Sequence, residues 1–228
     1  MIQLTPRLKA CASMITGKTV CDIGTDHAYL PAWLILKEKA DRVIATDVRE
    51  GPLRSAKETL RRFDVSDRIE LLLSDGFDDV RPDGITDVVI AGMGGETIRD
   101  ILTAESASFL KEGINLVLQP MSKAELLRKW LAGNGYAVTR EIPVKETKIY
   151  SIMQVHYNGI FHEISAAESY IGKLNPADPM THAYAENILK RLSNRAKGLE
   201  KNNSIREADK VRQLINEITL RLQYGGTI

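Results

Sequence analysis

Four aspartates stand at or just after the ends of short apolar runs in the first third of the chain: Asp22, Asp26, Asp47 and Asp75. In a parallel sheet the carboxyl ends of neighbouring strands meet at one edge, where α/β proteins bind their ligands. Aspartates gathered at that edge attract a cation and repel a phosphate. A single one is equally well explained as a helix cap or turn residue, but four at successive strand ends favour one shared site.

The loop from Asp22 to Ala28 stands where a nucleotide-binding α/β protein has its phosphate loop. A dinucleotide fingerprint needs three glycines in the pattern G-x-G-x-x-G. Here only Gly24 is present, and Asp26 takes the second glycine position. An acidic side chain would repel a pyrophosphate bound at the start of the following helix. The loop therefore disfavours NAD and FAD.

S-adenosyl-L-methionine makes the opposite demand, because it carries a sulfonium cation and an ammonium group but no phosphate. Gly24 would let the backbone approach this cofactor, and Asp22 would accept hydrogen bonds from loop amides or, through water, from its amine. Asp47, 25 positions after Asp22, is placed to bind both ribose hydroxyls, and Asp75 to accept from the adenine amino group. We therefore predict S-adenosyl-L-methionine as the cofactor.

A glycine-rich segment, Gly92 to Glu96, follows the fourth apolar run and should face the transferred methyl group. Clustered glycines allow close approach of a flat substrate, although a sharp strand-to-helix turn explains them as well. Gln119 to Met121, after the fifth run, would make another wall of the same site.

Short β-rich runs alternate with helical patterns in a way that is typical of βαβ units. We predict strands at 19–23, 42–46, 68–73, 87–91 and 114–119, and helices at about 27–38, 52–63, 95–103 and 122–132. A first helix should begin at Thr5-Pro6 and be ended by Gly17, and the helix at 122–132 should begin with a Ser122–Glu125 capping box.

Two further β-runs, at 136–142 and 149–156, are joined by too few residues for a crossover helix and should pair antiparallel. The predicted fold is therefore α/β, a doubly wound, Rossmann-like sheet of five parallel strands plus an antiparallel pair. That arrangement is typical of class I methyltransferases.

Beyond about residue 158 the β pattern ends, so we predict a methyltransferase domain over 1–159 and a helical domain over 160–228. Long helical patterns at about 180–200 and 204–223 suit a coiled-coil-like pair, either within one chain or between two copies. We favour a monomer. The apolar residues recurring at helical spacing are Leu189, Leu192, Ala196 and Leu199, then Ile205, Ala208, Val211, Ile215, Ile218 and Leu222.

Three segments resemble the bacterial TrmK family: DIGTDHAYLP (22–31), AGMGGE (91–96) and LQPM (118–121). The resemblance runs from the N-terminal helix to about residue 156. Members of this family are tRNA methyltransferases that act on N1 of adenine 22. The resemblance implies that activity here, with a cofactor site that we predict to comprise Asp22, Gly24, Thr25, Asp47, Asp75, Gly76, Ala91 and Gly92.

Adenine N1 presents a lone pair at neutral pH, so positioning should matter more than a strong base. The product is a cation, and we expect Asp26 to stabilise it by charge complementarity. His27 would orient Asp26 or contact RNA, while Tyr29 and Met93 would pack against the extruded base. Local hydrogen bonding and ordinary core packing are the alternatives for these three residues.

Basic residues dominate the last helical patterns, with eight lysines and arginines against three acids between positions 190 and 212. Such an excess suits a grip on RNA phosphates, although a solvated charged face is the alternative. A methyltransferase for a small molecule or a protein would leave the basic tail without a target, whereas a non-catalytic RNA-binding or assembly module would use its helical tail. The RNA-binding candidates are Lys190, Arg191, Arg195, Lys197, Lys201 and Arg206.

Composition bounds the remaining classes. The chain is 43% hydrophobic and 27% charged with a net charge of +1, and its apolar runs are too short to cross a bilayer. It lacks the apolar stretch of a signal peptide, and its two cysteines lack metal-site spacing. We expect a cytoplasmic protein with tRNA as partner, no membrane association and no metal requirement.

Overall fold

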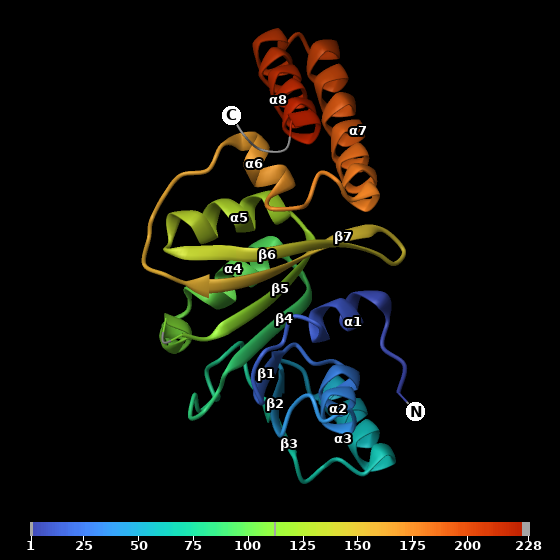
Figure 1. Cartoon of the computed structure of the whole chain (residues 1–228), viewed down its shortest axis with the longest axis vertical. Coiled ribbons are helices and arrows are strands. Elements are labelled where there is room, and N and C mark those ends of the chain that lie inside the picture. The colour runs from blue at the N-terminus through green and yellow to red at the C-terminus, as the bar shows by residue number, and fades with distance from the viewer. Residues whose placement is uncertain (1, 112, 225–228) are drawn as a thin grey trace.

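The computed structural model describes residues 2–111 and 113–224. Seven strands form one sheet in the order β3-β2-β1-β4-β5-β7-β6 (Figure 1). The first five pair in parallel, whereas β7 is antiparallel to both β5 and β6, which confirms the predicted sheet. The strands are β1 (Thr19–Ile23), β2 (Arg42–Asp47), β3 (Ile69–Leu73), β4 (Asp87–Gly94), β5 (Asn115–Ser122), β6 (Tyr136–Lys145) and β7 (Ile149–Tyr157).

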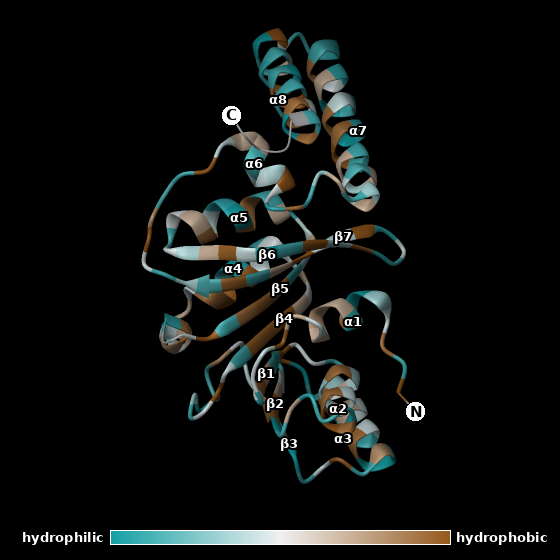
Figure 2. Cartoon of the chain, viewed as in Figure 1, coloured by the Kyte–Doolittle hydropathy of each residue, from teal (hydrophilic) through white to brown (hydrophobic). Residues whose placement is uncertain are grey.

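Helices cover both faces of this sheet, and strand residues alternate between the two layers. Val20 and Val43 pack toward α1, α2 and α3, whereas Cys21 and Ile44 pack toward α4, α5 and the 3-10 helix η1. Figure 2 shows that the central strands β4 and β5 are mostly hydrophobic. These helices are α1 (Pro6–Ala12), α2 (Tyr29–Leu36), α3 (Glu50–Phe63), α4 (Gly95–Thr103), η1 (Glu105–Lys111) and α5 (Ala124–Gly133).

The start of α1 is as predicted, with Thr5 as N-cap and Pro6 in the first turn, but the helix ends at Ala12, well before Gly17. The predicted capping box of α5 is wrong. Strand β5 continues through Ser122, which pairs in register with Gly94 of β4, so Ser122 is held in the sheet and the N-cap is Lys123, without a side-chain cap.

The C-terminal segment forms α6 (Ala166–Ile171), α7 (Pro179–Lys201) and α8 (Ile205–Tyr224). Helices α7 and α8 lie side by side within the chain (Figure 1), and their apolar stripes share one buried cluster with α6. Ile205 is the exception among the predicted stripe residues, because it begins α8 and is 52% exposed. None of the helices in the described residues has the length and apolarity needed to cross a membrane.

A buried arginine joins this helical segment to the sheet. Arg128 of α5 donates to the Glu141 carboxylate of β6 at 2.6 Å and to the carbonyl oxygen of Ser169 in α6 at 2.7 Å. Its guanidinium also lies 3.4 Å from the Tyr184 hydroxyl of α7. Both charged side chains are almost fully buried, so these bonds hold elements from both sides of the predicted boundary near residue 160 together.

Candidate active site

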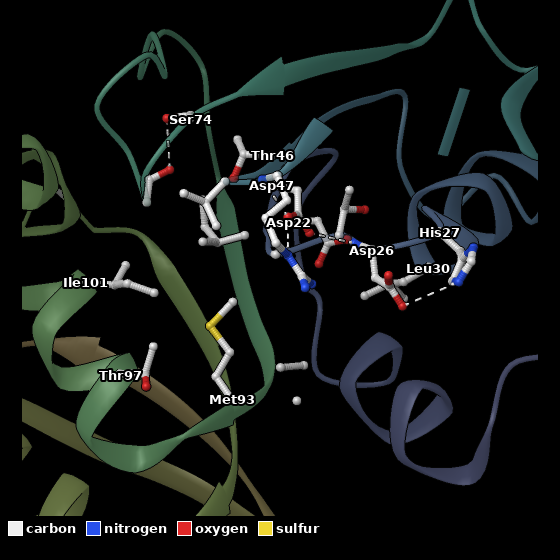
Figure 3. Close-up of a pocket in the computed structure, with 18 of the residues that line it drawn as sticks. Asp22, Asp26, His27, Leu30, Thr46, Asp47, Ser74, Met93, Thr97 and Ile101 are labelled. Atoms are coloured by element: carbon white, nitrogen blue, oxygen red, sulfur yellow. Dashed lines mark hydrogen bonds and ion pairs between the residues drawn. The ribbon is translucent and has the colours of Figure 1, made fainter. Parts of the chain in front are cut away.

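A cavity of about 480 Å³ opens at the carboxyl ends of β1, β2, β3 and β4, next to the point where the strand order reverses (Figure 3). All the residues predicted for catalysis and cofactor binding line it, so the fold brings together segments from residue 22 to residue 93. They are Asp22, Gly24, Thr25, Asp26, His27, Tyr29, Asp47, Asp75, Gly76, Ala91, Gly92 and Met93. The role of each remains a prediction.

Asp22 and Asp47 are the two buried acids of the four, and burial affects Asp22 most clearly. Burial, with a smaller contribution from the charge of Asp47, raises the pKa of Asp22 from 3.8 to about 6, and the neighbouring Thr25 side chain partly opposes this. Asp22 is 5% exposed and lines the cavity. At neutral pH its carboxylate is therefore a poorly solvated negative charge, which a cationic ligand would stabilise.

Asp47, at the end of β2, already accepts two backbone hydrogen bonds. Its Oδ1 accepts from the amide of Arg49 at 3.0 Å, and its Oδ2 accepts from the amide of Asp26 at 3.3 Å. A carboxylate offers about four acceptor sites, so capacity remains for hydroxyl groups of a ligand. The hydrogen bond from the Asp26 amide also joins the loop after β1 to the end of β2.

Two hydroxyls in the cavity wall keep hydrogen-bonding capacity. The Oγ1 atoms of Thr25 and Thr46 are buried and make no hydrogen bond of ordinary geometry within the described residues, although the Thr25 hydroxyl lies near enough to Asp22 to lower the pKa of that carboxyl. The loop that carries Thr25 is fixed, because the amides of Gly24 and Thr25 donate to the Thr46 carbonyl at 2.9 and 2.8 Å. Buried hydroxyls that keep this capacity in a rigid wall are suited to a polar ligand.

Gly24 suits its own backbone conformation as well as a ligand that approaches closely. Its φ is +73°, and a Cβ at this position would lie 2.1 Å from the Met93 methyl carbon. Met93 of β4 covers Gly24. Its thioether lies in the cavity wall (Figure 3). The sequence predicted that a ligand would approach this glycine closely. In the structure the Met93 side chain occupies part of that space.

The mouth of the cavity combines an acid with an aromatic surface. His27 and Tyr29 stack with ring centroids 5.5 Å apart at an interplanar angle of 20°, and Tyr29 is 46% exposed. The His27 Nε2 atom lies 3.7 Å from the Asp26 Oδ2 atom, and Figure 3 marks this pair. An exposed stack beside a carboxylate can receive a flat, positively charged ring.

Arg7 of α1 lines the same cavity and was missed from sequence. Its Nη1 donates to Gln119 Oε1 at 2.9 Å, and the same oxygen accepts from the Gly92 amide at 3.0 Å. Its Nε lies 3.8 Å from Glu146 Oε2. Arg7 thus holds the glycine-rich end of β4 through Gln119. Arg7 reaches the cavity because α1 packs against the sheet, and no local sequence pattern predicts that packing.

The predicted RNA-binding residues lie apart from this cavity. All are exposed, and their role remains a prediction. One of them, Arg191, lines a second groove described below. Five of these residues are on α7 and one is on α8: Lys190, Arg191, Arg195, Lys197 and Lys201, and Arg206, respectively.

Comparison with known families places the sheet among methyltransferases: a family model described as a methyltransferase domain matches residues 4–153. The tRNA (adenine(22)-N(1))-methyltransferase of Bacillus subtilis strain 168 is 34% identical over 154 residues. That alignment covers 67% of this chain and 64% of the relative, less than two thirds of the relative's length.

Solved structures extend the likeness through the C-terminal helices. A putative tRNA (m1A22) methyltransferase of Streptococcus pneumoniae, in complex with S-adenosyl-L-methionine, superposes with a TM-score of 0.80 at 27% identity, covering 95% of this chain and 99% of that one. The Bacillus subtilis TrmK structure gives 0.82 at 25% identity, covering 96% and 99%. These matches confirm the resemblance indicated by the three sequence motifs.

Proposed function

This chain belongs to the methyltransferase domain family, and we propose that it transfers a methyl group from S-adenosyl-L-methionine to N1 of adenine 22 in bacterial tRNA. The observation that carries this proposal is the meeting of four aspartates around one cavity at the reversal of strand order. Both arginines that line the cavity already contact the protein: Arg7 is bonded to Gln119, and Arg49 lies 3.8 Å from Asp47.

The cofactor, when bound, supplies an electrophilic methyl group on a sulfonium centre. The residues present fit it, because the buried hydroxyls of Thr25 and Thr46 and the remaining acceptor sites of Asp47 suit a ribose and an amino acid. We assign Asp47 to the ribose hydroxyls, Asp75 to the adenine amino group and Asp22 to the amine. Thr25 and the backbone at Gly24, Gly76, Ala91 and Gly92 would complete the wall.

For the acceptor, this chain's residues chiefly need to align adenine N1, because its lone pair needs no prior deprotonation. The exposed stack of His27 and Tyr29, with Met93 opposite, offers a surface for an extruded base. Asp26 lies beside that stack and would stabilise the positive charge that develops on the ring.

We further propose that the chain works in the cytoplasm as a monomer, with α7 and α8 supplying phosphate contacts. The packing of both apolar stripes within one chain supports the monomer. Exposed basic side chains along these helices support the RNA contact.

Methyl transfer to an unmodified tRNA transcript tests the activity, with nucleoside analysis for 1-methyladenosine. A matched transcript with guanosine at position 22 should accept no methyl group. If calorimetry detects cofactor binding but no 1-methyladenosine forms, the assigned substrate is wrong, and a small molecule or protein acceptor, or a non-catalytic role, replaces it.

A further inference from the structure

We propose that a second groove binds the phosphate backbone of tRNA beside the target adenine, an inference that rests on the function proposed above. This junction groove has a volume of about 560 Å³. It is lined by residues 120–125 at the β5–α5 connection, residues 145–151 at the β6–β7 hairpin, and residues 184–191 of α7. Figure 1 shows where these elements lie in the fold.

Four exposed cations from these three elements line the junction groove: Lys123, Lys145, Lys148 and Arg191. Glu125 is the acid among its lining residues. Lys123 pairs with Glu96, but none of the ion pairs found in the described part of the chain involves the other three. Unpaired cations that converge from separate elements attract a polyanion.

The start of α5 adds donors to this charge. Its N-cap residue, Lys123, has φ 54° and gives no side-chain cap, so the first amides of this ten-residue helix are left for an outside acceptor. The helix dipole favours an anion at this end. A phosphate at the groove would therefore meet both side-chain cations and backbone donors.

The junction groove begins one strand away from the reaction site. Met93 pairs in register with Pro120, and Gly94 with Ser122, so the cavity wall on β4 and the groove wall on β5 are adjacent. Neighbouring strands lie about 5 Å apart. An RNA strand that inserts one base into the cavity thus has its adjoining phosphates close to the groove.

The walls of the groove are also fixed before any ligand binds. Ser151 and Tyr184 line it, and both contact the buried guanidinium of Arg128, at 3.2 and 3.4 Å. That guanidinium is held in turn by Glu141. Because the hairpin and α7 are joined in this way, RNA binding should require little loss of backbone conformational entropy in the groove walls.

The test is equilibrium binding of an unmodified tRNA transcript over a range of salt concentrations. In the groove variant Lys145→Gln, Lys148→Gln and Arg191→Gln are combined. At about 0.7 per contact, losing three phosphate contacts should reduce the slope of log affinity against log salt by about two. At about 0.15 M salt this corresponds to about 50-fold weaker binding. Cofactor affinity, measured by calorimetry, should stay within about twofold.

The matched control combines Lys39→Gln, Arg61→Gln and Arg68→Gln, which removes the same charge from exposed positions at the opposite, amino ends of the strands. Equal tRNA binding by the two triple variants overturns the groove, and so does weaker binding with an unchanged salt slope. A wild-type chain that methylates tRNA while the groove variant binds normally refutes the groove alone. A wild-type chain that neither binds nor methylates tRNA refutes the proposed function too.

Discussion

Asp22→Asn should stabilise the protein while weakening its cofactor binding. The pKa of Asp22 lies at about 6 in the fold against 3.8 for a free side chain, chiefly because of burial. Between these values the folded chain keeps a proton that the unfolded chain has lost, so the free energy of unfolding falls as pH rises through this window. Above pH 6 the fold carries the full cost of a buried, charged carboxylate.

The magnitude follows from the same interval. Each pKa unit corresponds to about 1.4 kcal/mol, so the cost at neutral pH is about 3 kcal/mol. Asparagine keeps the shape of the side chain but does not ionise. The variant should therefore gain up to about 3 kcal/mol at pH 7.5 and nothing near pH 4, with a rise in Tm of about 6 to 12 °C at the higher pH for a chain of this size.

Urea unfolding of the cofactor-free protein at several pH values from 4 to 8 measures this difference. The control is Asp41→Asn, because the Asp41 side chain is 75% exposed and a surface change of this kind shifts stability by at most about 0.5 kcal/mol. Calorimetry with S-adenosyl-L-methionine should show the opposite effect. Loss of one charge-assisted hydrogen bond, about 1.5 to 3 kcal/mol, weakens binding about tenfold or more.

The pH profiles of cofactor binding provide a second readout. A cationic ligand beside Asp22 favours its ionised form, so wild-type affinity should rise with pH through about 6 and the Asn variant should lack this rise. Two results would contradict this reasoning: a variant that is no more stable at pH 7.5, or one that binds the cofactor as tightly as the wild type. Either would mean that the buried charge of Asp22 does not both destabilise the fold and bind the cationic cofactor.

Three further changes test other parts of the site. Tyr29→Ala should lower kcat/KM for tRNA at least tenfold with unchanged cofactor affinity, because it removes half of the exposed stack; equal kcat/KM would assign the stack to structure alone. Arg7→Gln should lower kcat with little change in fold. Without the Arg7 guanidinium, the Gln119 side chain that accepts from the Gly92 amide is no longer held in place. A variant that changes only in Tm would contradict this. Glu141→Gln should cost about 3 to 5 kcal/mol in urea unfolding, because it leaves the Arg128 charge buried and unpaired.

Local sequence was sufficient for the strands and the aspartates because both depend on short-range patterns. The central strands β1, β2, β4 and β5 are brief apolar runs buried on two faces, and Asp22 and Asp47 are fixed by where two of those runs end. The same locality explains the error at Ser122. Its capping pattern was genuine, but pairing with Gly94 in the sheet outcompeted it.

Features that depend on distant packing could not be predicted. Arg7 is 112 residues away from its partner Gln119, and Arg128 is 41 residues from Ser169. Such contacts are set by how whole elements dock, which hydrophobic periodicity does not specify. For the same reason the count of basic residues over 190–212 predicted RNA contacts along the second half of α7 and the first half of α8. The junction groove instead combines Arg191 with lysines near residues 123 and 145.

The buried Arg128 pair also bears on how the proposed enzyme would distinguish a folded RNA from a free nucleoside. Because α5, α6, α7 and the β6–β7 hairpin are bonded through one guanidinium, the junction groove keeps a fixed position relative to the cavity. A free adenosine can occupy the cavity but gains nothing from the groove, whereas tRNA gains from both only if the target base and its flanking phosphates match that spacing. Selectivity for a nucleotide within folded tRNA then follows from a rigid distance between two sites, without any need for α7 and α8 to close over the RNA.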